Sequence, residues 1–156
     1  MTATAPALTA LAHGWCALSV LHGRIESHLE RALQAGHGLS VREYSLLDVL
    51  SRQHDGEGGH LQMKQVADSV LLSQSATTRL VTRLEDRGLL GRYLCPTDRR
   101  GIYTDVTGTG LELLGEARPT SEEALRTALR EAAEDPRLEP LVRTVETAWV
   151  PTMAAA

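Results

Sequence analysis

Hydrophobic residues recur at steps of three and four along most of this chain, a pattern that predicts helices rather than strands. The first stripe predicts one long amphipathic helix over residues 8–33, which ends near Gly36 and Gly38. Its inward positions are Leu8, Leu11, Trp15, Leu18, Leu21, Ile25, Leu29 and Leu33. A helix of roughly seven turns is long for a small domain, so its hydrophobic stripe needs a packing partner.

Two shorter helices are expected next. Ser40 and Glu43 are spaced as a capping box, which predicts that the second helix begins at Ser40. It continues through Tyr44, Leu47 and Leu50 towards a glycine-rich turn over residues 54–60. The third helix is short, and its hydrophobic positions are Met63, Val66, Ala67 and Val70.

Residues 73–87 predict an amphipathic helix whose outer face is entirely polar. Ser73 can cap its start, and Gly88 suits a left-handed stop at its end. The inward positions are Thr77, Leu80, Val81 and Leu84, and the outward ones are Ser75, Thr78, Arg79 and Thr82, with Arg83 at the edge. Hydroxyl groups and arginines on such a face can reach phosphates and bases in a DNA major groove. An ordinary solvated helix face can have the same composition.

The connection between the last two helices predicts a helix-turn-helix. Only Leu71 and Leu72 separate the third helix from Ser73, which is as short as that motif requires. The turn of this motif usually contains a glycine, whereas this chain has Leu71 there.

The period changes after Gly88. Residues 89–95 and 101–106 are β-prone segments on either side of a charged turn, which together predict a hairpin wing. Arg99 and Arg100 at its tip could enter a DNA minor groove, where negative potential is concentrated. A hairpin with a merely solvated turn is the alternative.

The remaining residues predict two more helices. Thr107 can cap the first of them, whose inward positions are Leu111, Leu114 and Ala117. Pro119 is expected to kink or restart this helix. Asp135 and Pro136 predict the start of the last helix, which Pro140 could delay. Its stripe consists of Leu138, Leu141, Val142, Val145 and Trp149.

The charge distribution narrows the choice of partner. The net charge is −4, yet residues 73–101 carry six arginines against three acidic residues. A basic island in an acidic chain favours one docking surface over general affinity for nucleic acid. Cys16 and Cys95 are too few for a disulfide framework, and neither a signal peptide nor a membrane-length apolar run is recognisable. We therefore expect a cytoplasmic, nucleoid-associated protein.

The ordered set of motifs resembles the MarR family of transcriptional regulators. The resemblance is carried by LSQSATTRLVTRLEDRGLLGR (72–92), DRRG (98–101) and VTGTG (106–110). It implies a mainly α winged helix-turn-helix fold of about six helices and a small β-hairpin. Residues 1–38 and 108–156 would be dimerisation helices around a DNA-binding lobe at 39–107, in a single intertwined domain.

The resemblance also implies a homodimer on a pseudo-palindromic DNA operator, and repression relieved by a small ligand. Asp98 would brace the wing, and Arg100 with Arg99 would reach the minor groove. The full set of implied DNA contacts is Ser73, Gln74, Ser75, Thr77, Thr78, Arg79, Thr82, Arg83, Asp98, Arg99 and Arg100.

Members of this family often bind phenolic or anionic compounds in a crevice between the dimer helices and the DNA-binding lobe. The residues that could line such a crevice for an amphipathic ligand are Trp15, His22, Arg42, Tyr44 and Met63. Some of them can equally be plain core residues. A cysteine in the first helix senses peroxides in some relatives, so Cys16 offers a redox alternative; as a small buried hydrophobe it would be inert.

Two other classes of function compete with a DNA-binding regulator. Winged helices also serve as protein-docking modules without DNA, although the local positive charge and the arginine-tipped wing favour DNA. No phosphate-binding glycine loop, nucleophile motif or metal-ligand set is recognisable, so we expect no enzyme activity, no cofactor and no metal. His22 and Glu26 lie one turn apart, but a dedicated metal site needs three or four ligands.

Overall fold

The computed structural model describes residues 4–53, 60–94 and 102–148. The chain divides into two compact units, and the boundaries fall inside two long helices. One unit combines Met1–Arg31 with Glu122–Ala156, and the other is Ala32–Ser121. We call them the terminal unit and the central unit.

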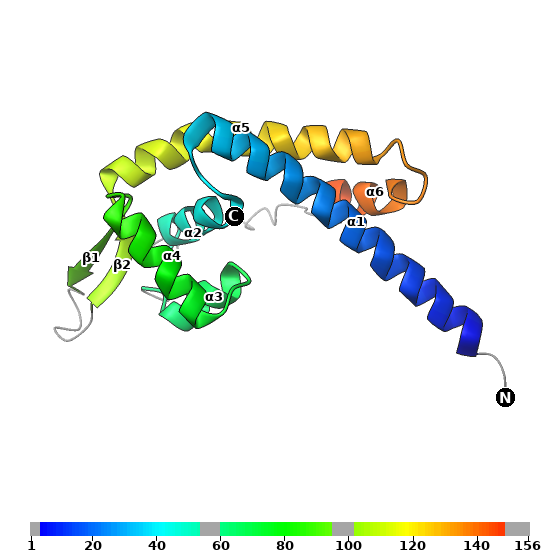
Figure 1. The fold of residues 1–156 in the computed structure, drawn as a ribbon, viewed down its shortest axis with the longest axis horizontal. Coiled ribbons are helices and arrows are strands. Elements are labelled where there is room, and N and C mark those ends of the chain that lie inside the picture. Colours follow the sequence, from blue (N-terminus) through cyan, green and yellow to red (C-terminus); the bar gives the residue numbers. More distant parts are fainter. Residues whose placement is uncertain (1–3, 54–59, 95–101, 149–156) are drawn as a thin grey trace, which may run out of the picture. The chain divides into compact units, whose positions relative to one another are not determined.

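The described residues are mainly helical, as the hydrophobic pattern predicts. In chain order the elements are α1 (Thr4–His37), α2 (Val41–Ser51), α3 (Met63–Ser69), α4 (Gln74–Asp86), β1 (Leu90–Leu94), β2 (Ile102–Val106), α5 (Gly108–Ala132) and α6 (Glu139–Ala148) (Figure 1). The six helices and one hairpin in this part of the chain confirm the expected winged helix-turn-helix fold.

The central unit is held together by one hydrophobic core. α2, α3, α4 and the hairpin surround it, and the end of α1 and the beginning of α5 close it. Leu33 from α1 and Leu114 and Ala117 from α5 are fully buried there. This explains why the central unit begins at Ala32 and ends at Ser121. A DNA-binding lobe at residues 39–107 stays a prediction.

The start of α2 and the end of α4 confirm two local signals. The Ser40 hydroxyl accepts a hydrogen bond from the Glu43 N–H, and the Glu43 carboxylate accepts one from the Ser40 N–H, which completes the capping box. Gly88 has a φ of 73°, and its N–H donates to the Glu85 carbonyl. Glycine adopts this left-handed conformation without the steric cost that a Cβ brings.

The turn of the helix-turn-helix is left-handed without a glycine. Leu71 has a φ of 56°, and its side chain is 77% exposed. The Leu72 N–H donates to the Ala67 carbonyl at 3.1 Å and the Leu71 N–H to the Asp68 carbonyl at 3.4 Å, the bonding pattern of a Schellman cap. These two bonds offset the cost of a branched side chain in a left-handed conformation.

The hairpin pairs β1 and β2 antiparallel, from Leu90 opposite Val106 to Leu94 opposite Ile102. Thr107 then caps α5 as predicted, because its hydroxyl accepts a hydrogen bond from the Gly110 N–H. The same hydroxyl donates to the Gly88 carbonyl at 2.6 Å. α5 therefore begins directly against the end of α4.

For α5, the structure excludes one of the two alternatives for Pro119 and contradicts the expected position of Leu111. The helix runs unbroken from Gly108 to Ala132 through Pro119, so the proline does not restart it. Pro119 costs one backbone hydrogen bond, and the turns on both sides are anchored by the buried residues Ala117 and Ala124. Leu111 was expected to face inward but is 50% exposed, whereas Leu114 and Ala117 are buried as expected.

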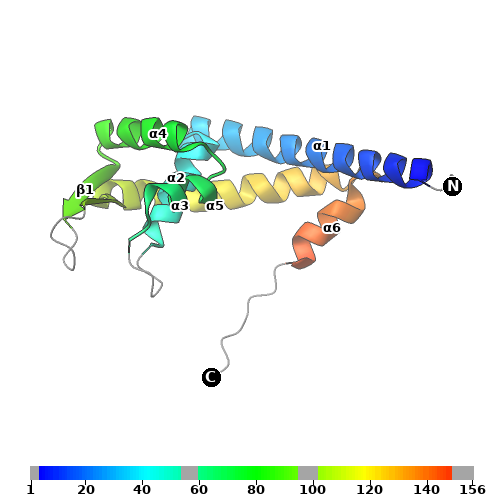
Figure 2. The same ribbon diagram turned by 90° about the horizontal axis from the view of Figure 1, so that it is seen from below.

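The terminal unit has a small core of its own. Leu21, Leu129, Ala132, Leu138 and Val142 are buried together from α1, α5 and α6. α6 doubles back after the turn at residues 133–138, where the Leu138 and Glu139 N–H groups donate to the Asp135 carbonyl (Figure 2). Pro140 thus lies in the first turn of α6, whose start is delayed to Glu139.

The described residues leave part of the predicted stripe on α1 exposed. Leu21 and Leu33 are buried, but Leu11 and Trp15 are 71% and 70% exposed. Leu18 is 47% exposed. In the ranges that are described, no helix has the length and hydropathy needed to cross a membrane.

Candidate nucleic-acid interface

α4 presents a polar face to solvent and a hydrophobic face to the core. Its stripe of Thr77, Leu80, Val81 and Leu84 is buried as predicted. The Ser73 hydroxyl accepts a hydrogen bond from the Ala76 N–H, which confirms the predicted cap. The exposed side chains of the helix and its cap are Ser73, Gln74, Ser75, Thr78, Arg79, Thr82, Arg83, Asp86 and Arg87.

One expected DNA contact is wrong. Thr77 is fully buried, and its hydroxyl donates to the Ser73 carbonyl at 2.9 Å. Its side chain therefore packs α4 against the core and cannot reach a base. Thr78 and Thr82 are exposed, and their hydroxyls donate to the carbonyls of Gln74 and Thr78. Each of these hydroxyls can accept a hydrogen bond from a base through its lone pairs, or rotate to donate its proton to a phosphate.

One flank of α4 is tied to the wing. Arg92 on β1 donates to both carboxylate oxygens of Glu85, at 2.8 and 3.2 Å. The hydrogen bonds from Arg92 to Glu85 raise the pKa of Arg92 above its usual range. The bidentate pair fixes the strand at a defined distance from the helix, although its solvent exposure limits its contribution to stability.

The opposite flank is tied to the start of α2. The Glu43 carboxylate is buried and lies 3.3 Å from the Arg87 guanidinium and 3.7 Å from that of Arg83. Arg87 also donates to the Gly38 carbonyl at 3.1 Å. Sequence reasoning found Glu43 as a capping residue but missed this second role, because its partners lie about forty positions away along the chain.

A cationic cavity of about 280 Å³ opens on this second flank. Ser40 and Arg42 line it from the start of α2, and Arg79 and Arg83 line it from α4. Its apolar wall consists of Leu72, Ala76 and Leu80. Arg42 also donates to the Val70 carbonyl at 3.2 Å, so it connects α2 to the helix-turn-helix turn.

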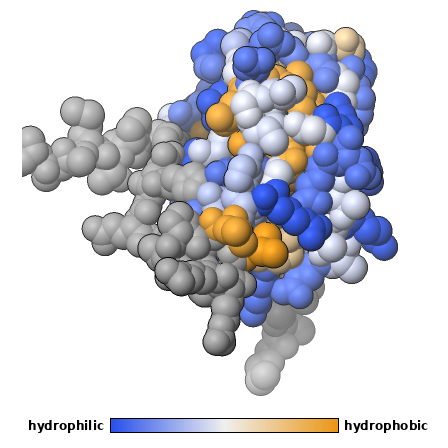
Figure 3. Space-filling view, turned by 90° about the vertical axis from the view of Figure 1, so that its left-hand side faces the viewer, coloured by the Kyte–Doolittle hydropathy of each residue, from blue (hydrophilic) through white to orange (hydrophobic). Residues whose placement is uncertain are grey.

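The base of the wing is held by a buried amide. Gln53 is 5% exposed and donates to the Thr104 carbonyl and the Asp105 carboxylate, both at 2.9 Å. Its carbonyl oxygen accepts from the Leu61 N–H at 3.3 Å. The expected residues at the tip, Asp98, Arg99 and Arg100, lie outside the described residues, as does Cys95. Figure 3 shows hydrophobic residues on the surface beside hydrophilic ones. The exposed large hydrophobic residues of the hairpin are Tyr93, Leu94 and Ile102.

The five residues expected to line a ligand crevice fall in both units. Trp15 and His22 belong to the terminal unit, where His22 lies 3.7 Å from Glu26. In the central unit Arg42 lines the cationic cavity, and Met63 lines a separate cavity of about 430 Å³. Burial raises the pKa of the Tyr44 phenol, while its hydrogen bond with Ser121 opposes this shift. A shared crevice for all five stays a prediction.

The rings of His60 and Tyr103 line the larger of these two cavities. They stack with centroids 3.5 Å apart and planes 7° from parallel. The rest of the lining is mainly hydrophobic, with Leu50, Val66 and Val81 at the core side. Such a lining suits a small amphipathic molecule.

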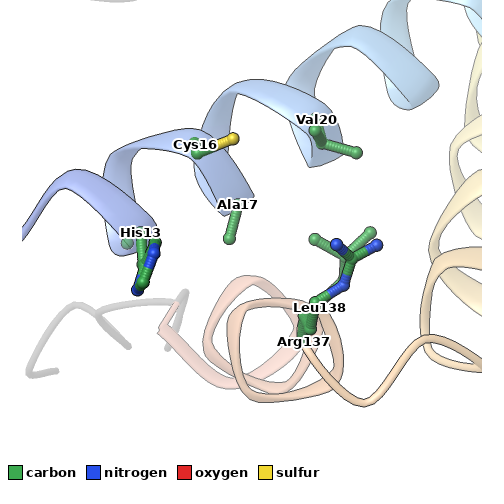
Figure 4. Close-up of a pocket in the computed structure, with 7 residues that line it drawn as sticks. His13, Cys16, Ala17, Val20, Arg137 and Leu138 are labelled. Atoms are coloured by element: carbon green, nitrogen blue, oxygen red, sulfur yellow. The ribbon is translucent and has the colours of Figure 1, made fainter. Parts of the chain in front are cut away.

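Cys16 is exposed and not a small buried hydrophobe as expected. It lines a cavity of about 510 Å³ within the terminal unit, where His13, Ala17 and Val20 of α1 face Arg137 and Leu138 (Figure 4). The buried interpretation of this thiol is therefore wrong for the isolated chain.

These features agree with a comparison to known proteins. The model of the MarR family matches residues 37–101, which include α2, α3, α4 and the first strand of the hairpin, β1. This part of the chain is similar to the MarR family. The transcriptional regulator MhqR of Bacillus subtilis is 31% identical to this chain over 102 residues, which are 65% of this chain and 66% of MhqR. The match to another B. subtilis regulator, YkoM, spans 55% of that protein, so both matches cover less than two thirds of the relatives.

Solved MarR-type structures extend the likeness to the whole chain. A MarR family regulator of Streptomyces coelicolor, solved in complex with DNA, has a TM-score of 0.63 and 27% identity, covering 100% of this chain and 94% of that one. CouR of Rhodococcus jostii, solved with p-coumaroyl-CoA, has a TM-score of 0.62 and 29% identity, covering 88% and 92%. The similarity to MarR-family transcriptional regulators supports the expectation that the chain is not an enzyme.

Proposed function

We propose that this chain is a sequence-specific DNA-binding transcriptional regulator of the MarR family. The observation that carries the proposal is the outward face of α4, on which Ser75, Thr78, Arg79 and Thr82 are exposed on a helix-turn-helix. An arginine can bond two acceptors of guanine in the major groove, and the hydroxyls can bond phosphates or bases. The DNA complex of the S. coelicolor relative supports the same use of the fold.

Selection of genomic fragments tests DNA binding even where the operator sequence is unknown. Fragments retained by the purified protein would be measured by fluorescence anisotropy against an unrelated competitor. We expect Arg79→Ala to weaken specific binding by roughly ten- to a hundredfold, because a lost bidentate base contact costs about 1–3 kcal/mol. Arg126→Ala is the matched control, since Arg126 is exposed and paired with Glu122 in the terminal unit. If the wild type prefers no fragment over competitor, the protein is a docking module and the proposal is wrong.

The regulator acts as a homodimer on a pseudo-palindromic operator. The uncovered stripe of α1, with Leu11, Trp15 and Leu18 exposed, supports a second copy as its partner. A two-fold dimer presents two copies of α4 to half-sites about one helical turn apart. Repression follows when the bound dimer overlaps a promoter. A reporter gene placed behind the selected fragment measures whether the regulator lowers or raises transcription.

A small amphipathic ligand releases the operator. The cavity next to Met63, with its stacked His60 and Tyr103 rings, supports a ligand that has an aromatic body. The relative CouR binds p-coumaroyl-CoA, which contains such a body. Screening aromatic acids and their thioesters for loss of anisotropy tests this step, and release by none of them would count against ligand control.

A redox signal is the second candidate, favoured by the exposure of Cys16. Its thiol could be oxidised from the cavity beside Arg137. Peroxide treatment of wild type and Cys16→Ser separates the two signals. Release of DNA from the wild type alone supports redox control, and equal release from both proteins excludes Cys16 as the sensor.

A further inference from the structure

The two sides of α4 differ, because the wing closes one of them and the other is open. One flank is closed by the wing through the Glu85–Arg92 pair. The other flank opens into the cationic cavity formed with the start of α2. A helix in the major groove, which is about 12 Å wide, has a sugar-phosphate strand along each side. With α4 in the groove, the wing would lie near one sugar-phosphate backbone and the cavity would face the other.

The lining of the cavity concentrates positive charge. Arg42, Arg79 and Arg83 all line it, and guanidinium groups remain charged at any physiological pH. The Glu43 carboxylate contacts this cluster, but it lies closer to Arg87 than to Arg83. The Arg79 side chain makes no ion pair or hydrogen bond with another described residue. Cations that lie in one concavity attract an anion, and the single Glu43 carboxylate is shared between Arg83 and Arg87.

Two of these arginines are held in place before any ligand arrives. The hydrogen bond to the Val70 carbonyl orients the Arg42 guanidinium. The Glu43 carboxylate lies 3.7 Å from the Arg83 guanidinium and orients it as well. A guanidinium has five N–H groups, and the bond to the Val70 carbonyl uses one part of this fork. Side chains that are already ordered lose less entropy on binding, so this arrangement favours a bound anion.

We propose that the cavity lined by Ser40, Arg42, Arg79 and Arg83 is a phosphate site that holds one backbone phosphate of DNA beside α4. The inference rests on the proposed DNA-binding function and adds α2 to the interface. Arg42 and Arg83 donate hydrogen bonds to the phosphate oxygens, and Ser40 forms one side of the cavity. Because Arg42 also bonds the helix-turn-helix turn, the phosphate sets the depth at which α4 enters the groove.

The salt dependence of DNA binding tests the site through Arg42. Each neutralised phosphate contributes about 0.9 to the slope of log Kobs against log salt concentration. We expect Arg42→Gln to lower that slope by about 0.9 per bound protomer and to weaken operator and competitor DNA by the same factor. Arg42→Lys keeps the charge and should keep the slope. Arg126→Gln removes one exposed arginine from the terminal unit and should change neither quantity.

An unchanged slope in Arg42→Gln would overturn the proposal, even if affinity falls, because lost contact with the Val70 carbonyl explains such a fall without a phosphate. Wild-type binding to the operator would persist in that case, so the failure would be distinct from a failure of the proposed function.

A second measurement separates DNA phosphate from a free anion. Inorganic phosphate is titrated into the free protein at constant ionic strength, while the arginine Nε–Hε signals are followed by NMR. The proposal is supported if the arginine signals shift at lower concentrations of a short DNA duplex than of inorganic phosphate, and if both shifts are lost in Arg42→Gln. The bound phosphate then belongs to the DNA backbone. Saturation by inorganic phosphate in a wild-type protein that binds no duplex would overturn the assignment to DNA.

Discussion

Gly110 lies where the first turn of α5 passes against the chain that follows α4. A Cβ at this position would lie 2.2 Å from the Leu89 carbonyl oxygen and 2.7 Å from Val106 Cγ1. The Leu89 carbonyl also accepts the Thr107 N–H, so it cannot move away without the loss of that bond. Only glycine allows this approach of the helix to the hairpin.

We expect Gly110→Ala to lower the free energy of unfolding by about 1–3 kcal/mol, the usual cost of overpacking. Gly115→Ala is the matched control on the same helix, since a Cβ there meets no atom within 4 Å. It should raise stability by up to about 1 kcal/mol through helix propensity. Urea denaturation of both variants measures the difference, and equal effects would contradict the close approach at Gly110.

Asp135 has a strongly shifted acid–base equilibrium. Hydrogen bonds from the Arg137 side chain and backbone, with the charge of Arg24, lower its pKa from 3.8 to about 2. A carboxylate with a lower pKa in the folded state stabilises the fold above its unfolded pKa. That contribution is lost as the pH falls through the folded pKa.

Asp135→Asn should therefore be less stable than the wild type at neutral pH, and the difference should disappear between about pH 4 and pH 2. Thermal midpoints measured across this range give the comparison. Glu146→Gln on α6 is a control, since its side chain is exposed. A constant gap between wild type and Asp135→Asn down to pH 2 would show that the loss is not electrostatic.

At the level of elements, the wing depends on α2 through one side chain. Gln53 lies just after the end of α2, and its amide bonds the Thr104 carbonyl, the Asp105 carboxylate and the Leu61 N–H. Buried polar groups that lose their partner cost more than the bond itself contributed. The position of the hairpin relative to α2 is therefore sensitive to this residue.

Gln53→Ala should cost roughly 1–3 kcal/mol of stability and weaken DNA binding by loosening the hairpin. Gln65→Ala is the matched control, because it removes a glutamine whose carbonyl oxygen accepts the exposed Gln62 N–H, and it should cost less. Hydrogen exchange of the Thr104 and Val106 amides reports directly on the hairpin. Unchanged exchange in Gln53→Ala would mean that β1 alone holds β2.

For the whole molecule, the uncovered stripe of α1 predicts how the chain assembles. Trp15 is 70% exposed in the single chain, and a contiguous exposed stripe of this kind marks an interface. We expect Trp15→Asp to shift the protein from dimer to monomer in sedimentation at micromolar concentration, with loss of operator binding. Leu94→Asp changes an exposed hydrophobic residue of the wing and should leave the mass unchanged. A wild-type monomer would contradict the dimer.

Local signals predicted most of the elements. The capping box at Ser40, the left-handed stop at Gly88 and the buried stripe of α4 all follow from bonds within one turn or from a 3.6-residue period. Hydrogen bonds within one turn and the 3.6-residue period both depend on residues close together in the sequence, so they can be predicted from it. The same reasoning identified the exposed hydroxyls and arginines of α4.

Contacts between distant segments decided the rest. The bond from Arg42 to Val70, the bonds from Gln53 to the wing and the exposure of Cys16 depend on which helices meet, and no local pattern records that. Thr77 shows the limit within a single helix, because its hydroxyl suits DNA while its position in the stripe buries it. The sequence by itself determined the elements and the winged helix-turn-helix class, since these rest on short-range bonds and periodicity. Only the tertiary structure decided which arginines share one cavity, because charge on neighbouring helices converges only after the core has packed.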